Sequence, residues 1–148
     1  MMRKFSDKIL IATKNQGKVA EIKDLVKDIP ITFLSLSDFP NIPDVIEDGV
    51  TFEENALKKA RTIAAKTGLP SLADDSGLCI DALGGQPGVF SSRYAGEQTS
   101  DLEKCKHILE EMSEIPDNSR SARFVCVLAF VFPHGEEHIF EGVCEGRI

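Results

Sequence analysis

A chain of 148 residues suits a single domain and is long enough to bury a core without disulfides or structural metals. Its net charge of −7 argues against a general nucleic-acid binder or a protein of anionic membrane surfaces, because both depend on basic residues. The four cysteines and three histidines show no metal-site spacing, and no apolar run reaches transmembrane length. We therefore expect a cytoplasmic protein that binds neither membranes nor nucleic acids.

The first elements resemble an anion-binding unit. Residues 8–12 are a short apolar run that predicts a buried strand, and a helix follows from Lys18 to about Asp28 with Val19, Ile22, Leu25 and Val26 on one face. The loop between them contains Gly17, so its backbone N–H groups and the helix dipole can point at a phosphate. Side chains that could add hydrogen bonds or charge are Thr13, Lys14, Asn15 and Lys18. An ordinary strand–helix connection with solvated lysines is the alternative.

The next segment ends in a pair of acids and a second helix. After a predicted strand at residues 31–34, a proline-containing loop leads to Glu47, Asp48 and Gly49. Thr51 and Glu54 form the pattern of a capping box, which predicts a helix to about Lys66 with Gly68 as its stop. The cations Lys58, Lys59 and Arg61 lie outside the apolar stripe of this helix, where charged side chains are usually solvated surface.

The stretch from residue 72 to residue 96 has the composition of a shaped site. An apolar approach leads into Asp74 and Asp75, which we expect where a strand ends in a glycine turn at Ser76-Gly77. If the strand instead persists through both acids, they point to opposite sides and only one of them belongs to the site. A turn-rich surface loop with solvated acids is the alternative.

The last third predicts a helix and a hairpin. Thr99 or Ser100 should cap a third helix, with Leu102, Cys105, Leu109 and Met112 spaced for burial. Residues 120–132 form a long strand that is apolar on both faces after Arg123, which is typical of a central strand. A turn at 133–135 returns the chain as a strand to its end.

A basic loop and two separated acidic turns suit a Mg²⁺-dependent nucleotide enzyme. Carboxylates hold a hard cation that bridges phosphate oxygens, while lysines and the loop position the polyphosphate. One carboxylate can orient and deprotonate the attacking water.

Several ordered motifs resemble the inosine/xanthosine triphosphate pyrophosphatase family. They occupy residues 12–18, 48–60, 72–78, 82–89, 92–96, 123–126 and 141–146, which together extend over nearly the whole chain. The resemblance implies an α/β fold with a long central mixed sheet flanked by helices, two lobes around a nucleotide cleft, and a homodimer. It also implies hydrolysis of ITP, dITP and XTP to the monophosphate and pyrophosphate.

The resemblance also assigns residues. Substrate phosphate would be bound by Thr13, Lys14, Asn15, Gln16, Gly17 and Lys18, and Lys59 matches a family lysine near the phosphates. Glu47 and Asp75 would bind Mg²⁺, Asp75 would also be the general base, and Ser76 would contact the substrate.

The resemblance departs from the family at the end of the chain. Family members continue with a Gly-Tyr-Asp-Pro-type motif, a lysine and a His-Arg pair that complete the base pocket and phosphate clamp. We therefore expect one domain over residues 1–148 that lacks its C-terminal segment, and the residues present do not identify the donor that reads the purine O6. Two alternatives stay open: a nucleotide-binding module inactivated by truncation, and another Mg²⁺-dependent nucleotide phosphohydrolase.

Overall fold

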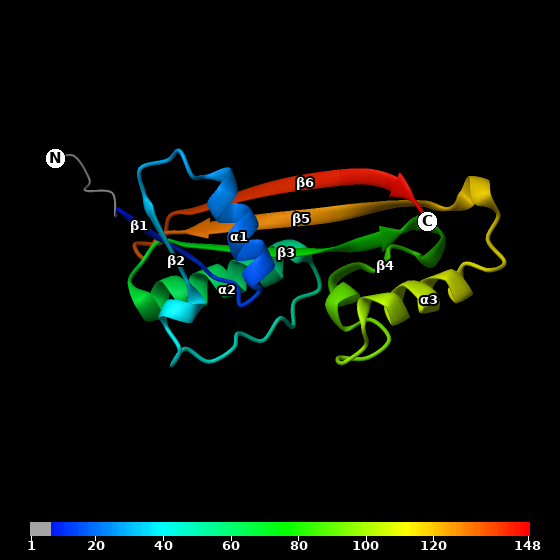
Figure 1. The fold of residues 1–148 in the computed structure, drawn as a ribbon, viewed down its shortest axis with the longest axis horizontal. Helices are drawn as coiled ribbons and strands as arrows, with labels where there is room; N and C mark the ends of the chain where they lie inside the picture. The colour runs from blue at the N-terminus through cyan, green and yellow to red at the C-terminus, as the bar shows by residue number, and fades with distance from the viewer. Residues whose placement is uncertain (1–6) are drawn as a thin grey trace. The chain divides into compact units, whose positions relative to one another are not determined.

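Strands and helices of a mixed α/β fold make up residues 7–148, the part of the chain that the computed structural model describes (Figure 1). The strands are β1 (Lys8–Ile11), β2 (Thr32–Ser35), β3 (Ser71–Ile80), β4 (Gln86–Pro87), β5 (Ser121–Val131) and β6 (Glu137–Arg147). The α-helices are α1 (Gln16–Leu25), α2 (Phe52–Thr67) and α3 (Asp101–Glu111).

The sheet is six-stranded with the order β2-β1-β3-β5-β6, and β4 pairs with β3 outside this path. β1 runs parallel to β2 and β3, whereas β4 is antiparallel to β3. This arrangement confirms the predicted mixed sheet flanked by helices. The chain divides into two compact units, the first made of residues up to 74 with 128–140 and the second of 75–127 with 141–148.

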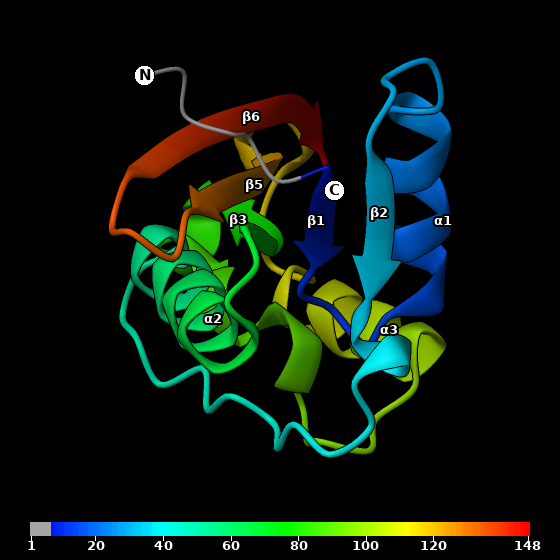
Figure 2. The ribbon, with the colours of Figure 1, turned by 90° about the vertical axis from the view of Figure 1, so that its left-hand side faces the viewer.

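In the first unit, the predicted strand–loop–helix unit is present as β1, the loop and α1, and Figure 2 shows α1 beside β2. Asn15 is the N-cap of α1 and its side chain accepts a hydrogen bond from Lys18 N at 3.1 Å, which satisfies one of the amides that a helix start leaves without a partner. The predicted apolar stripe is wrong at its end, because Leu25 closes the helix with an exposed side chain and Val19 is the buried residue.

Helix α2 also belongs to the first unit, and both of its ends follow the prediction. Thr51 Oγ1 accepts a hydrogen bond from Glu54 N, and Gly68 takes the left-handed conformation at the C-cap (φ 68°) that favours glycine. The second hydrogen bond of the predicted capping box is wrong, because the Glu54 carboxylate accepts from Val50 N at 2.8 Å and not from the amide of the cap residue Thr51. The buried side of the helix contains Ala56, Ala60, Ile63 and Ala64.

Strand β3 continues through the two acids to Ile80, so the predicted end of the strand at a glycine turn is wrong. Both Asp74 and Asp75 are buried. Because successive strand residues point to opposite faces, the two carboxylates leave β3 on opposite sides.

The second unit has a core of Ile80, Ile108, Met112 and Ala122. Ser100 caps α3 and forms a complete capping box with Glu103. The predicted buried stripe of α3 is wrong for Leu102, Cys105 and Leu109, which are exposed, and right for Met112. The amphipathic period was therefore placed out of phase, since the buried pair is Ile108 and Met112.

The β5–β6 hairpin closes the chain as predicted. Phe132 N donates to Glu136 O at 2.9 Å at the turn, and Ile148 N donates to Arg120 O at 3.0 Å at the other end. β5 lies between β3 and β6, as expected for a strand that is apolar on both faces. β6 ends the strand path of the described sheet, and its residues are exposed along its length.

Candidate active site

The loop before α1 is organised by its own side chains. Asn15 N donates to Thr13 Oγ1 at 3.2 Å, and Gln16 Nε2 donates to Ser37 Oγ at 2.9 Å, which ties the helix start to the segment after β2. Lys14 points outward and pairs with exposed Asp44. The predicted loop residues therefore separate into those that hold the loop and those that carry charge.

Lys18 is the cation of this loop that turns inward. Its Nζ lies 2.7 Å from Asp74 Oδ2, and the lysine side chain is partly exposed while that of Asp74 is buried. Because the ammonium carries three N–H groups and is partly exposed, it can contact a bound anion while it keeps its ion pair with Asp74. Lys18 thus presents a positive charge at the start of α1, where Asp74 holds it in position.

Lys59 is the second inward cation, and its side chain is only 14% exposed. Its Nζ lies 2.6 Å from Glu47 Oε1 and donates to the backbone oxygen of Asp74 at 2.5 Å. We name Lys18, Glu47, Lys59 and Asp74 the charged cluster. It brings together four residues, from the start of α1, the acidic turn, α2 and β3, that lie in separate motifs of the sequence.

Asp74 is the member of the charged cluster that sequence reasoning underrated. The sequence shows two adjacent acids, and the family resemblance assigns a chemical role to Asp75 alone. The structure joins Asp74 to both lysines, through its carboxylate to Lys18 and through its carbonyl to Lys59. No sequence pattern distinguishes which of two neighbouring acids faces a given lysine.

The turn that carries Glu47 is held against the start of α2. Gly49 N donates to Asn55 Oδ1 at 2.7 Å, and the Asn55 side chain is 1% exposed. A Cβ on Gly49 would lie 2.7 Å from that oxygen and 2.8 Å from Glu54 Cβ, so the glycine is required by close approach. Asn55 was missed by sequence reasoning, although a polar residue on the buried side of α2 is a signal for such a role.

The neighbouring ion pairs of α2 are peripheral. Lys58 Nζ lies 2.6 Å from Asp48 Oδ1, and this hydrogen bond lowers the pKa of the exposed Asp48 carboxyl below its ordinary value. Arg61 pairs with Glu137 and lowers the pKa of that carboxyl in the same way. Of the three helix cations considered from sequence, only Lys59 joins the charged cluster.

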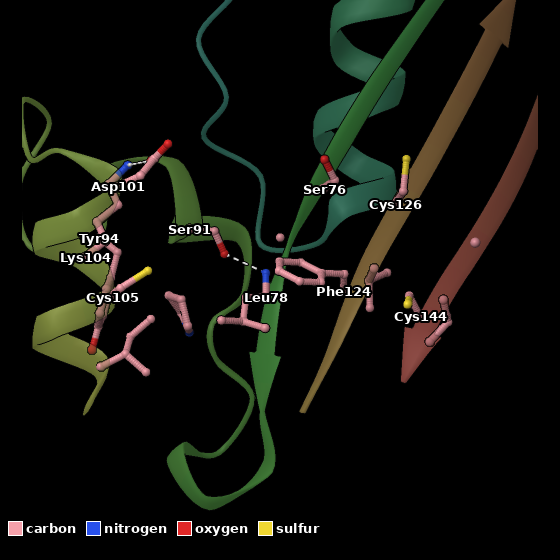
Figure 3. A pocket seen from close by; sticks show the side chains of 16 residues that line it. Ser76, Leu78, Ser91, Tyr94, Asp101, Lys104, Cys105, Phe124, Cys126 and Cys144 are labelled. Carbon is pink, nitrogen blue, oxygen red and sulfur yellow. Dashed lines mark hydrogen bonds and ion pairs between the residues drawn. The ribbon is translucent and has the colours of Figure 1, made fainter. Parts of the chain in front are cut away.

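In the second unit, Asp75 is followed on β3 by Ser76, which lines a pocket of about 740 Å³. Figure 3 shows this pocket between α3 on one side and β3, β5 and β6 on the other. Its walls are mainly apolar, with thiols from Cys105, Cys126 and Cys144. Sequence reasoning foresaw a shaped site in the stretch 72–96 but not the contribution of α3 and the hairpin.

Tyr94 borders the same pocket and has a strongly shifted titration. Burial, followed by its hydrogen bond to the Glu111 carboxylate, raises the pKa of Tyr94 to about 12. The phenol is therefore neutral at physiological pH, where it acts as a hydrogen-bond donor to Glu111.

The described residues bear on the metal site and on the absence of membrane spans that the sequence predicts. Within residues 7–148, no group of three or more His, Cys, Asp or Glu side chains is arranged to hold a metal ion. Over the same range, no helix is long and apolar enough to cross a membrane. The assignment of Mg²⁺ to Glu47 and Asp75 stays a prediction.

Comparison with known proteins decides the family. Residues 9–148 match the model of the Ham1 family. The chain belongs to the Ham1 family. Its relatives include the dITP/XTP pyrophosphatase of Geobacter sulfurreducens, which is 50% identical over an alignment that covers 95% of this chain and 71% of the relative. The dITP/XTP pyrophosphatase of Oceanobacillus iheyensis is 51% identical over an alignment that covers 95% of this chain and 72% of that relative.

Solved structures agree with this Ham1 assignment. A HAM1 protein from Coxiella burnetii superposes with a TM-score of 0.88 at 46% identity. The alignment covers 95% of this chain and 72% of the Coxiella burnetii chain. A nucleoside-triphosphatase, also named dITP/XTP pyrophosphatase, from Mycobacterium abscessus has a TM-score of 0.84 at 43% identity. That alignment covers 95% of this chain and 74% of the Mycobacterium abscessus chain. The resemblance seen in the motifs is thereby confirmed, and so is the implied α/β fold with a mixed sheet flanked by helices.

Proposed function

We propose that this Ham1-family chain hydrolyses deaminated purine nucleoside triphosphates, with ITP, dITP and XTP as substrates, to the monophosphate and pyrophosphate in a Mg²⁺-dependent reaction. The names of its relatives support the substrate class. The observation that carries the proposal is the charged cluster, in which Lys18 and Lys59 both contact Asp74 in the first unit.

The two lysines supply the charge that a triphosphate requires. Lys18 lies in the first turn of α1, where the backbone amides and the helix dipole also favour an anion. Lys59 is largely desolvated, so its attraction for a phosphate oxygen is weakly screened. Both ammonium groups are held in place before substrate arrives, which avoids reorganisation during the reaction.

Asp75 is our candidate for the general base, with Ser76 beside it as a substrate contact. The carboxylate of Asp75 takes a proton from water as the water oxygen bonds to phosphorus, and the bond between the α and β phosphates breaks to release pyrophosphate. Asp75 is buried on β3, which restricts the orientations that its carboxylate can take.

The donor chemistry of the candidate residues fits Mg²⁺. Glu47 is a partly exposed carboxylate beside Lys59, and Asp75 is a second hard oxygen donor. Mg²⁺ in proteins commonly uses one or two carboxylates and completes its shell with water and substrate phosphates, so a cluster of three protein ligands is not required. When bound by Glu47 and Asp75, the ion would neutralise charge on the phosphate oxygens.

Product analysis tests this function. The protein is incubated with ITP, XTP, ATP and GTP, with Mg²⁺ or with EDTA, and the products are identified by chromatography. Monophosphate and pyrophosphate from ITP and XTP, formed only with Mg²⁺, would support the proposal. Binding without turnover would favour a nucleotide-binding module, whereas orthophosphate or indifference to the base would favour another phosphohydrolase.

Substitution of the candidate base gives a sharper test. Asp75→Asn keeps the shape of the side chain but removes the proton acceptor and a metal charge, so we expect turnover to fall by roughly 10²-fold or more. Circular dichroism should show an unchanged fold. Turnover close to that of the parent would refute the role of Asp75.

The resemblance also leads us to propose a cytoplasmic homodimer. Light scattering on the purified chain would test the oligomeric state, and a monomer across the micromolar range would refute it.

A further inference from the structure

The ion pair between Lys59 and Glu47 joins a cation to a carboxylate that is a candidate Mg²⁺ ligand. Lys59 Nζ lies 2.6 Å from Glu47 Oε1, a close charge-assisted contact. The lysine side chain is 14% exposed and that of the glutamate 35%, so solvent screens this pair less than it screens a fully exposed one. In this arrangement the ammonium neutralises the carboxylate.

A metal ion and an ammonium compete for the Glu47 carboxylate. Mg²⁺ binds oxygen ligands at about 2.0–2.1 Å and carries two positive charges, so it repels an ammonium that contacts the same carboxylate. The repulsion is strong because the pair is partly withdrawn from solvent, where charges are weakly screened. Lys59 must therefore leave Glu47 when that carboxylate binds Mg²⁺.

Asp74 provides a second contact that keeps Lys59 within the charged cluster. Lys59 Nζ donates to the backbone oxygen of Asp74 at 2.5 Å, and that oxygen belongs to strand β3, so it is uncharged and fixed. Lys18 Nζ lies 2.7 Å from the carboxylate of the same aspartate. An ammonium carries three N–H groups, so Lys59 can keep its bond to the carbonyl while it exchanges Glu47 for another anion. Both lysines thereby stay tied to one residue of the first unit.

We propose that Lys59 is the cation that Glu47 exchanges for Mg²⁺, and that this exchange releases the Lys59 ammonium to a substrate phosphate. The exchange rests on the proposed function and couples the metal and the phosphate of its site. The same ion pair must open for Mg²⁺ to bind Glu47 and for a phosphate to take the ammonium from Glu47. Each ligand therefore removes a cost from the binding of the other, and this coupling is reciprocal.

The neighbouring pair of Lys58 and Asp48 is a control that the chain itself supplies. Lys58 Nζ lies 2.6 Å from Asp48 Oδ1, and the two pairs join adjacent residues of the same turn to adjacent residues of α2. The side chains of Lys58 and Asp48 are 42% and 67% exposed, so water stabilises both charges when the pair opens. Removal of one partner of this outer pair should therefore change the affinity for Mg²⁺ or phosphate very little.

Titration of Mg²⁺ in the absence of nucleotide tests the first half of the exchange. Isothermal titration calorimetry measures the Kd of Mg²⁺ for the parent chain, Lys59→Met and Lys58→Met, and thermal unfolding verifies that each is folded; Lys59→Gln, which keeps a donor, replaces Lys59→Met if the latter does not fold. Lys59→Met should bind Mg²⁺ roughly three- to tenfold more tightly than the parent, because Glu47 no longer has to release an ammonium. Lys58→Met should stay within about twofold of the parent. A damaged site would weaken Mg²⁺ binding instead, so the direction of the change separates exchange from a merely structural role.

Titration of inorganic tripolyphosphate in EDTA tests the second half. Glu47→Gln keeps the shape of the side chain and an oxygen acceptor but removes the negative charge that holds Lys59. We expect Glu47→Gln to bind tripolyphosphate roughly three- to tenfold more tightly than the parent, whereas Asp48→Asn, which removes the same charge one residue away, should stay within about twofold. In the Lys59→Met background, Glu47→Gln should no longer tighten binding, because the ammonium that it would release is absent.

The exchange is overturned if the folded Lys59 variant binds Mg²⁺ no more tightly than the parent, or if Glu47→Gln binds tripolyphosphate no more tightly than Asp48→Asn. Neither titration requires turnover, so its failure is distinguishable from failure of the proposed function. Hydrolysis of ITP to IMP and pyrophosphate by the parent, with unaltered affinities in the variants, would leave the function intact and reject the exchange. The expected gains in affinity, in a chain that hydrolyses no nucleotide, would support the exchange and reject the enzymatic activity.

Discussion

Gly49→Ala should disturb the turn that presents Glu47 to the charged cluster. The added Cβ would lie 2.7 Å from Asn55 Oδ1 and 2.8 Å from Glu54 Cβ, both closer than real Cβ contacts allow. Asn55 is 1% exposed and belongs to α2, so it cannot move away without disturbing the helix. We expect the turn to move instead and to break the hydrogen bond from Gly49 N to Asn55 Oδ1.

The magnitude follows from this contact. Overpacking or a buried amide left without its partner costs about 1–3 kcal/mol, and the lower backbone entropy of the unfolded alanine chain returns about 0.4–1 kcal/mol. These effects oppose each other, and the middle of each range gives a net loss of unfolding free energy of about 1.3 kcal/mol. At roughly 2–4 °C per kcal/mol for a protein of this size, Tm should fall by several degrees.

Thermal unfolding measures the stability, and the Mg²⁺ concentration for half-maximal turnover reports the position of Glu47. Gly146→Ala is the matched control, because a Cβ there meets nothing within 4 Å. We expect Tm to fall and the Mg²⁺ requirement to rise in Gly49→Ala only. Equal Tm values for the two variants would refute the argument from close approach, whatever the activity.

Three further predictions concern single side chains. Tyr94 is the only tyrosine and the chain has no tryptophan, so phenolate absorbance should titrate near pH 12 in the folded protein and near pH 10 in urea. The stability that comes from this raised pKa is present below pH 10 and is lost as pH rises through about 12. A midpoint near pH 10 in the folded protein would contradict the prediction. Asn15→Ala should lower the urea-unfolding free energy by about 0.5–2 kcal/mol, whereas Asn15→Asp keeps the capping oxygen and should not. Lys59→Met should lower kcat/KM for ITP by roughly 10²-fold, whereas Lys58→Met, which loses only an exposed ion pair, should have little effect. Similar losses of kcat/KM for the two variants in steady-state assays would show that Lys59 has no specific role in substrate binding.

Local signals predicted the element boundaries well where the cause is local. Thr51 and Gly68 bound α2, and Ser100 with Glu103 begins α3, because a cap involves only residues within one helical turn. The burial of α3 was predicted out of phase, since Leu102 and Leu109 are as apolar as the buried Ile108. Which apolar side of a short helix faces the core depends on what packs against it, and that partner is distant in sequence.

By itself, the sequence determined the family, the order of strands and helices, and the presence of a basic loop with two acidic turns. These depend on residues close together along the chain and on motifs that keep their spacing. Only the tertiary structure decided that Lys18 and Lys59 converge on Asp74 and that Asn55 holds the turn before Glu47. It also decided that Phe124 and Lys104 line one pocket. Such contacts join segments that are far apart in the chain, and their partners are selected by packing and by the direction of each side chain, which no local pattern records.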